Sequence, residues 1–457
     1  MKTQVLTLGV LLVLCMTGGS VQAQSQRKAT LTFIWHAGDR AELLRKIAEE
    51  YTRQTGVEVK ALLPPLTEAY YRQIADEFAR KGSAFDLCIF DSQSMSEFAS
   101  QGHIILLNDR LKASPKVRAT DFDPAALQRY AEYPEGSGNL YALPINQDCM
   151  GLVYRRDLLE DPKEQAAFKE KYGYDLAVPQ SYDQLRDIAE FFTRPAANLH
   201  GIALYGSADY DACTSAFNNI FWSFGAELWD PQTGRAEGYL NSPRAKKALE
   251  YYRSLFAFAP PGFQDAYVPE VNKALQEGRV ALGLQWYYYF DEFAAQTAGT
   301  THKLGFAALP GQKGEDGVFR RFVMIGGQGV SISQYSKNKD EAWRFLEWFM
   351  SPQQQWKWVQ GGGKSGLRAI LRDPKFLAAS PANESFSLSL NLTKDYWHLP
   401  AYPQLLQIYQ QYVHRALTGE LPPAQALDLC AQEHEKILKA SAKDEKQGAG
   451  KEEPLRR

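Results

Sequence analysis

The stretch that decides the fold is ATLTFIW at residues 29–35, together with the segments that follow it. This stretch is strand-like, and an amphipathic helical pattern at 39–56 comes directly after it. A second strand is predicted for 57–63, a helix for 68–80, and a third strand for FDLCIF at 85–90. Strands that alternate with helices in this way are typical of a parallel sheet with crossover helices, so the sequence predicts an α/β protein.

The same alternation returns in the rest of the 457-residue chain. Ser181 and Gln184 form a capping-box pattern, and Ser242 before Pro243 indicates another helix start. Further strands are predicted at 201–205, 280–284, 303–309 and 329–333, and a further helix at 339–350. The chain is too long for one such sheet. We therefore expect two lobes, each with a parallel-type sheet flanked by helices, facing each other across a cleft.

The first 23 residues have the pattern of a secretory signal peptide. Lys2 is followed by an apolar run at 5–16 and then by small residues that lead to Ala23. The run is too short to span a membrane, which takes about 20 apolar residues. We expect cleavage after Ala23 and a soluble, exported protein, and the lack of a convincing lipid anchor favours the periplasm. The charged segment 443–457 is expected to be disordered.

Composition limits the partners that this chain can have. It contains 51 Lys and Arg against 53 Asp and Glu, so it lacks the basic excess of nucleic-acid binders. Its 9 Trp and 24 Tyr residues offer rigid apolar faces with a polar edge, on which sugars can stack. Export permits disulfides, but the spacing leaves the pairing open and fits no metal motif for the cysteines that remain after cleavage: Cys88, Cys149, Cys213 and Cys430.

The glycines at 361–363, followed by Lys364 and Ser365, resemble a phosphate-binding loop only superficially. Trp358 occupies the position where that loop needs its first glycine, and the run follows a helix rather than a strand. No GxSxG or HExxH motif is present, and no pair of nucleophile and base can be named. We therefore expect no catalysis, no cofactor and no metal. An exported carbohydrate-active enzyme and a binding protein for a charged solute stay open as alternatives.

Five segments, taken in order, resemble the extracellular solute-binding proteins of ABC importers, in particular the carbohydrate-binding group that includes maltose-binding protein. The resemblance extends from about 29 to 440, and its segments are 85–91 with 104–108, 140–159, 178–185, 274–286 and 326–352. It implies two lobes joined by hinge strands, with crossings near 145–151, 300–307 and 351–360. The lobes would comprise 24–146 plus 302–353 and 147–301 plus 354–442.

The resemblance also implies a function. The chain would be a monomeric periplasmic receptor that closes on a neutral sugar or polyol and delivers it to the membrane permease of an ABC importer. A further role in passing ligand occupancy to a sensor protein stays open.

Candidate ligand-binding residues come from the ends of the predicted strands and from the first crossing. The first group is Trp35, His36, Asp39, Asp91 and Ser92, although Asp39 and Asp91 could equally cap helices. The second group is Asn146, Gln147 and Asp148, a polar run between apolar flanks. In the resemblance, Asp148 aligns with a carboxylate that binds ligand hydroxyls.

Aromatic and glycine residues complete the candidate site. Trp286 and Tyr288 lie two positions apart and share a side of an extended chain, and the resemblance places a stacking platform here. Gly326 and Gly327 would let a ligand approach the backbone closely. Arg368 could bind hydroxyls with its guanidinium fork, although a surface salt bridge is equally compatible. Weaker candidates are Asn218, Trp222, Trp397 and His398.

Overall fold

The computed structural model describes residues 29–65 and 68–449, so the predicted signal peptide at 1–23 lies outside the described residues. The strands are β1 (Thr30–Ile34), β2 (Glu58–Leu62), β3 (Leu87–Asp91), β4 (Leu143–Arg155), β5 (His200–Ala203), β6 (Val280–Trp286), β7 (Leu304–Ala307), β8 (Gln312–Lys313), β9 (Phe319–Arg320), β10 (Val323–Ile332) and β11 (Thr393–Lys394).

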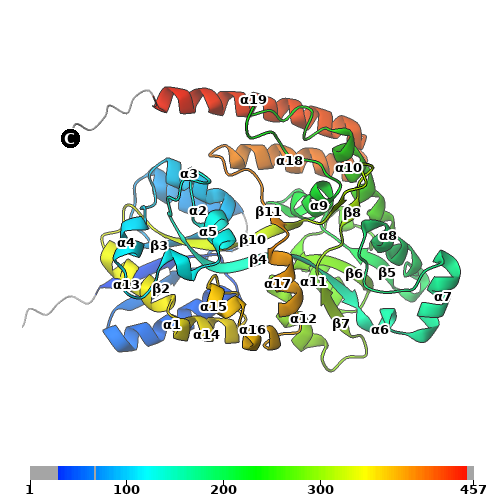
Figure 1. Ribbon diagram of the computed structural model, residues 1–457, viewed down its shortest axis with the longest axis horizontal. Helices are drawn as coiled ribbons and strands as arrows, with labels where there is room; N and C mark the ends of the chain where they lie inside the picture. Colours follow the sequence, from blue (N-terminus) through cyan, green and yellow to red (C-terminus); the bar gives the residue numbers. More distant parts are fainter. Residues whose placement is uncertain (1–28, 66–67, 450–457) are drawn as a thin grey trace, which may run out of the picture.

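Helices lie on both sides of these strands (Figure 1). They are α1 (Asp39–Thr55), α2 (Glu68–Ala79), α3 (Met95–Ser100), α4 (Asn108–Ala113), α5 (Pro124–Tyr130), α6 (Arg156–Leu159), α7 (Pro162–Tyr172), α8 (Tyr182–Phe191), α9 (Ala212–Ser223), α10 (Pro243–Leu255), α11 (Val268–Gln276), α12 (Phe290–Thr297), α13 (Lys339–Phe349), α14 (Pro352–Gln360), α15 (Arg368–Leu371), α16 (Pro374–Ala378), α17 (Asn383–Leu390), α18 (Tyr402–Leu417) and α19 (Pro423–Ala449).

The first lobe is built on the strands that the sequence predicts. β1 pairs in parallel with both β2 and β3, with Thr30 opposite Glu58 and Phe33 opposite Leu87. Phe33 and Ile34 are fully buried, because helices cover the sheet on both faces. The α/β prediction is therefore confirmed.

Two long strands, β4 and β10, join the lobes across the middle of the molecule (Figure 1). The amino half of β4 pairs antiparallel with β10, where Cys149 is opposite Ile325. Its carboxyl half pairs antiparallel with β6, where Met150 is opposite Trp286. β10 in turn pairs antiparallel with β3 of the first lobe. The sheets are thus mixed rather than parallel, and hydrogen-bonded ladders connect them through these two hinge strands.

The places where the chain crosses between the lobes differ in part from the expected ones. The expected crossing at 145–151 lies within β4. At 300–307 the chain does not return, because β7 pairs with the carboxyl half of β4, and the return runs along β10 instead. Helix α14, expected at a crossing, lies in the first lobe because the buried ring of Trp358 packs 6.1 Å from that of Trp35. The residue boundaries of the lobes stay a proposal.

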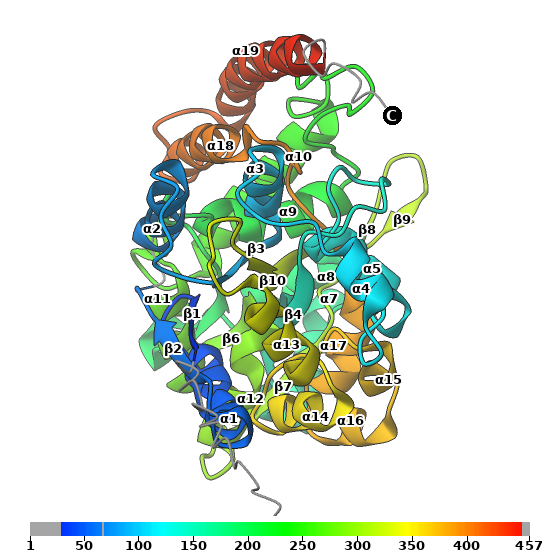
Figure 2. The same cartoon turned by 90° about the vertical axis from the view of Figure 1, so that its left-hand side faces the viewer.

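Helix α18 packs along α19, and together they cover α9 and α10 of the second lobe (Figures 1 and 2). α19 continues to Ala449, so the described part of the segment that we expected to be disordered is helical. Lys, Glu, Gln and Ala, which dominate that segment, are strong helix formers. Among the described residues, no helix combines the length and the apolar character needed to cross a membrane.

The predicted helix caps are confirmed in the second lobe and corrected in the first. Ser181 and Gln184 form the capping box of α8, and the Ser242 hydroxyl accepts the Ala245 N–H at the start of α10. At α1, however, Gly38 is the N-cap and Asp39 is the first helical residue, with no capping hydrogen bond from its side chain. Asp39 is therefore free to face the space beyond the helix.

The four described cysteines, Cys88, Cys149, Cys213 and Cys430, are free and fully buried. Burial raises the pKa of each thiol, because the thiolate would lose its hydration. Buried thiols of this kind are inert and pack as small apolar groups.

We therefore expect the folded protein, after signal removal, to show no reaction with an aromatic disulfide reagent at pH 8. The same protein unfolded in guanidinium without reductant should release the signal of four thiols. Absorbance of the released thiolate measures both states. A count of two or zero in the unfolded, non-reduced protein would show disulfides and contradict the arrangement described here.

Candidate functional site

A pocket of about 440 Å³ lies between the two lobes. Asp39 and Arg40 of α1 line it from the first lobe, together with the glycines at 361–363 and Lys364. From the second lobe come residues that follow β6, among them Tyr288 and Asp291. We refer to it as the interlobe pocket. Its walls carry both signs of charge and one large aromatic ring.

Asp148 lies on the hinge strand β4 directly behind this pocket. Its Oδ1 accepts the backbone N–H of Cys149 at 2.9 Å and that of Tyr288 at 3.1 Å, so it fixes the loop that carries the aromatic ring. Burial raises the pKa of Asp148 to about 7, although these two N–H groups and the charge of Lys364 favour the carboxylate. Its charge at neutral pH is therefore sensitive to what fills the pocket.

This raised pKa predicts how stability depends on pH. An unfolded aspartate has a pKa of about 3.9, so between about pH 4 and pH 7 the folded state holds a proton that the unfolded state has lost. The contribution of Asp148 to stability therefore falls as pH rises through this window. We expect Asp148→Asn to gain stability relative to the parent protein between pH 5 and pH 8, measured by urea unfolding.

Asp157 offers a control, because its pKa is shifted in the opposite direction. Burial favours its neutral form, but the ion pair with Arg155 lowers its pKa overall. Asp157→Asn should therefore show no relative gain over the same pH range. If the free energy of unfolding changed with pH in the same way for the parent protein and for Asp148→Asn, the raised pKa of Asp148 would be contradicted.

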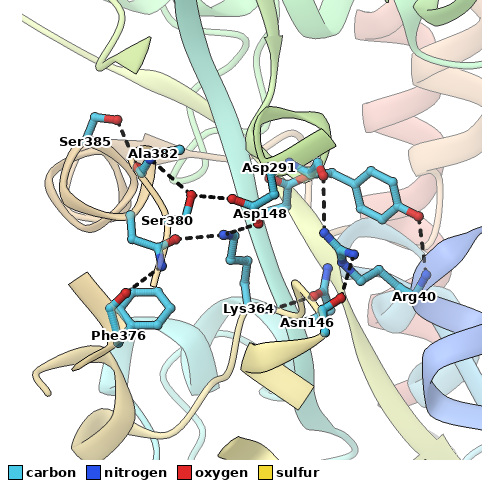
Figure 3. A network of polar contacts seen from close by, with 12 residues as sticks. Arg40, Asn146, Asp148, Asp291, Lys364, Phe376, Ser380, Ala382 and Ser385 are labelled. Atoms are coloured by element: carbon cyan, nitrogen blue, oxygen red, sulfur yellow. Dashed lines mark hydrogen bonds and ion pairs between the residues drawn. The ribbon is translucent and has the colours of Figure 1, made fainter. Parts of the chain in front are cut away.

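Arg40 ties the two lobes together at the pocket (Figure 3). Its side chain is buried, and its guanidinium donates to the carbonyl oxygens of Gly361 and Tyr288, each at 3.3 Å. It also lies over the ring of Tyr288, 4.8 Å from the ring centroid. The sequence did not single out this residue, because an arginine in the first turn of a helix gives no signal of burial.

Lys364 is the second buried cation of the site and was also missed (Figure 3). Its ammonium donates to Asp291 at 2.9 Å and to Asn383 at 2.7 Å, and its backbone N–H donates to the side chain of Asn146. Burial lowers the pKa of Lys364, and the charge of Asp291 opposes this shift. The glycine run before it lets the chain pass close to Arg40, whose guanidinium would clash with a Cβ at Gly362. The glycine run at 361–363 therefore allows this segment to pack closely against Arg40.

Gly326 and Gly327 lie on the hinge strand β10, and Trp286 at the end of β6 packs onto the first of them. The Trp286 ring lies over Gly326 so closely that a Cβ there would be 2.7 Å from it. Gly327 has φ +86°, and a Cβ there would be 2.4 Å from the carbonyl oxygen of Asn146. The space next to the two glycines is thus filled by the Trp286 ring and by the neighbouring strand, and a close approach of a ligand to this backbone stays a prediction.

A second polar group surrounds Asp91 at the end of β3. Its carboxylate accepts hydrogen bonds from the Gln328 amide at 2.7 Å and from the hydroxyl of Tyr210 in the second lobe. Burial lowers the pKa of His36, while the charge of nearby Asp91 opposes this shift. Tyr210 was missed because it lies in a loop with φ +47° and no periodic pattern marks it. Asp91 thus binds across the lobe boundary rather than capping a helix with its side chain.

Ser92 and His398 meet on Asp395, which the sequence analysis also missed. The buried carboxylate accepts from the hydroxyl of Ser92 at 2.7 Å and from the amide of Gln93 at 2.9 Å, and lies 2.8 Å from Nε2 of His398. Burial alone would lower the pKa of His398, but its bond to Asp395 raises the pKa overall. These contacts also join the first lobe to the segment that leads into α18.

Among the predicted binding residues, Asp39 and Tyr288 are the two that line the interlobe pocket as described. Trp35 is fully buried in the core of the first lobe. Asn218 and Trp222 lie on α9, every residue of which is buried, and Trp397 packs against Tyr409 and His434. Gln147 points to the opposite face of β4, where its amide donates to the carbonyl oxygen of Ser365. Arg368 bonds to the carbonyl oxygen of Phe122 and lines an outer groove.

The described residues contain no group of three or more His, Cys, Asp or Glu side chains placed to hold a metal ion. The chemistry that the site does offer is hydrogen bonding and ring stacking. It presents guanidinium, ammonium, carboxylate and phenol groups around the ring of Tyr288, whereas Trp286 at the end of β6 is not among the described lining residues.

Comparisons with known proteins show the family and the fold of this chain. The family model described as bacterial extracellular solute-binding protein matches residues 37–356, more than half of the chain. The chain is 25% identical over 430 residues to the Probable ABC transporter-binding protein of Deinococcus radiodurans, covering 91% of this chain and 95% of that protein.

Solved structures have the same fold. The structure of maltose-bound T. maritima MalE3 superposes with a TM-score of 0.75 at 23% identity, covering 90% of this chain and 100% of that one. An ABC transporter solute binding protein from Agrobacterium radiobacter K84 in complex with ribitol gives 0.77 at 22% identity, covering 90% and 98%. The predicted two-lobed fold is thereby confirmed, and the chain belongs to the family of bacterial extracellular solute-binding proteins.

Proposed function

We propose that this protein binds a neutral sugar or polyol between its lobes and delivers it to the membrane permease of an ABC importer. The observation that carries this proposal is the convergence of polar side chains from both lobes, Arg40 and Asp291 among them, around the ring of Tyr288, close in sequence to Trp286 at the end of β6. Ligand hydroxyls suit these donors and acceptors, and the C–H faces of a sugar suit the rings.

The charges around the interlobe pocket support an uncharged ligand. Lys364 is already paired with Asp291, and Arg40 is held by two carbonyl oxygens. The acidic residues Asp39, Asp291 and Glu292 line the same pocket, so neither sign dominates it. The similarity to proteins with bound maltose and ribitol supports the same ligand class.

We further propose that the mature protein works in the periplasm as a monomer, after removal of residues 1–23. Closure on the ligand would present both lobes together to the permease, because the ligand contacts the closed form most fully.

A thermal-shift screen against sugars and polyols tests the ligand class. A ligand that binds only the folded state raises stability by RT ln(1 + [L]/Kd), which is about 2.7 kcal/mol at a hundredfold excess over Kd. Ligands should be ranked at low and at high salt, because affinity for a neutral ligand should change little with ionic strength. The proposal would be contradicted if the affinity for the best ligand depended strongly on salt concentration, or if the protein hydrolysed a glycoside.

Trp286→Ala should weaken binding of the best neutral ligand by about 5- to 150-fold. A stacked ring contributes on the order of 1–3 kcal/mol by analogy with base stacking, which is the physical basis of this range. Titration calorimetry measures the affinity directly.

Two further variants make this result specific. Trp286→Phe should retain most of the affinity, because a ring face remains. Trp348→Phe alters a tryptophan that packs against Tyr51 on α1 and should leave the affinity unchanged. Equal affinities for the parent protein and Trp286→Ala would exclude this ring as a stacking platform.

A further inference from the structure

A second cavity, which we call the hinge cavity, has a volume of about 250 Å³. Gln147 of β4 and Ile325 of β10 line it, whereas their neighbours Asp148 and Gly326 face the interlobe pocket and Trp286. Successive side chains of a strand point to opposite faces, so the hinge cavity lies behind the strands that carry the interlobe site. Its other walls come from α5 of the first lobe and from the segment between α15 and β11 (Figure 1).

Two arginines of the hinge cavity lack partners. Arg129 on α5 is half-buried and Arg372 follows α15, and neither side chain makes a hydrogen bond or an ion pair with another described residue. Asp123 is the single carboxylate among the described lining residues. Its Oδ1 is occupied by the backbone N–H groups of Ala125 and Ala126. The cavity therefore has two guanidinium groups against one carboxylate, which leaves an excess of positive charge.

Uncharged polar groups complete the lining. The hydroxyl of Ser387 is buried and has no hydrogen-bond partner, although buried polar groups normally have one. Asn391 and Thr393 add an amide and a second hydroxyl on the same wall. A ligand with several acceptor oxygens would satisfy Ser387 and both guanidinium groups at once.

The surroundings of the cavity are also basic. Arg372 lines an adjoining groove as well, where Lys116, Arg118 and Arg368 are the other cationic residues and Asp121 is the single acid among the described lining residues. In a chain whose formal net charge is only −2, this is a local concentration of positive charge. Such a concentration attracts small anions.

We propose that the hinge cavity binds a small tetrahedral oxyanion, phosphate or sulfate, between Arg129 and Arg372. The planar guanidinium fork matches such an oxyanion, and charge-assisted hydrogen bonds of this kind are stronger than neutral ones. The phosphoryl group of a small phosphate monoester has the same chemistry and is the alternative source. This proposal does not depend on the nature of the ligand in the interlobe pocket.

The cavity is placed to influence the hinge. Tyr130 lines it, and its hydroxyl donates to the carbonyl oxygen of Gly326 at 2.6 Å. An anion held here would contact helices from both lobes as well as the two strands between them. If anion binding changes the affinity of the interlobe site, ligand binding must change the affinity for the anion by the same factor.

The test measures anion binding directly in the full mature chain. Equilibrium dialysis with radiolabelled inorganic phosphate at constant ionic strength should show saturable binding with one site per chain. Unlabelled sulfate and glycerol phosphate, added in separate arms, report which oxyanion the site prefers. The variants Arg129→Gln and Arg372→Gln should each raise the Kd about tenfold or more, since each removes a charged hydrogen bond.

Arg156→Gln serves as a matched control, because this first residue of α6 pairs with Glu160 outside the hinge cavity. It should leave phosphate binding unchanged, and circular dichroism melts should show that all three variants fold. No saturable phosphate or phosphomonoester binding would overturn the proposal. Binding that persists unchanged in the double variant Arg129→Gln/Arg372→Gln would overturn it as well.

Discussion

Replacing Gly327 by alanine should destabilise the protein by about 2–5 kcal/mol. The residue has φ +86°, a conformation that costs a residue with a Cβ about 1–2 kcal/mol. The added Cβ would also lie 2.4 Å from the carbonyl oxygen of Asn146 and 2.6 Å from the backbone nitrogen of Asp148. These atoms belong to the paired hinge strand, which cannot move aside without breaking its ladder, so overpacking adds about 1–3 kcal/mol.

Gly136 provides the matched control for this prediction. It has a similar φ of +80°, but an added Cβ there would meet no atom within 4 Å. Gly136→Ala should therefore lower the free energy of unfolding only by the cost of the left-handed backbone conformation, about 1–2 kcal/mol. Guanidinium unfolding followed by circular dichroism gives both free energies. Equal losses at the two positions would mean that the close approach of the hinge strands is not a constraint.

Lys364→Met should cost about 3–5 kcal/mol, because it breaks a buried ion pair and leaves the partners behind. The ammonium binds Asp291 and Asn383 and is almost completely buried, with its side chain 3% exposed. Its loss would leave the buried amide oxygen of Asn383 without its donor. Methionine keeps the length and the apolar stem, so the lost charge and hydrogen bonds account for the effect.

Two further variants separate this effect from a general loss of charge. Lys357→Met removes a lysine whose pair with Glu50 is more exposed, at 38% and 23%, and should cost about 0–1 kcal/mol. Adding Asp291→Asn to Lys364→Met should recover part of the loss, since neighbouring changes are not additive. Urea unfolding supplies all four free energies, and similar costs for Lys364→Met and Lys357→Met would refute the structural role of Lys364.

The sequence predicted the first lobe well because its signals are local. The strands around β1 are apolar, and Gly56 caps α1 in the left-handed conformation that favours glycine. The return between lobes was placed at 300–307 instead of in β10, because both segments have the apolar pattern of a strand in the sequence. Only their partners differ, and pairing between distant strands leaves no trace in a single sequence.

The candidate site was predicted in part for a similar reason. Asp148 stood out as a polar residue between apolar flanks, and Trp286 and Gly326 followed from the resemblance. Arg40, Lys364 and Tyr210 acquire their roles from partners far along the chain, which periodicity cannot reveal. Asn218 and Trp222 lie on α9, every residue of which is buried, and a ligand role for them stays a prediction.

Because both lobes share the strands β4 and β10, the chain cannot be divided into two separately folded lobes. A fragment ending near residue 155 would retain β1–β3 but lose β10, which covers the edge of β3. The unpaired N–H and C=O groups of that edge would then be exposed, and they could pair with strands of other chains and cause aggregation. Insertions, gene fusions and split reporters built on this scaffold therefore belong in peripheral loops, such as the one around Gly136, and no cut should separate the hinge strands.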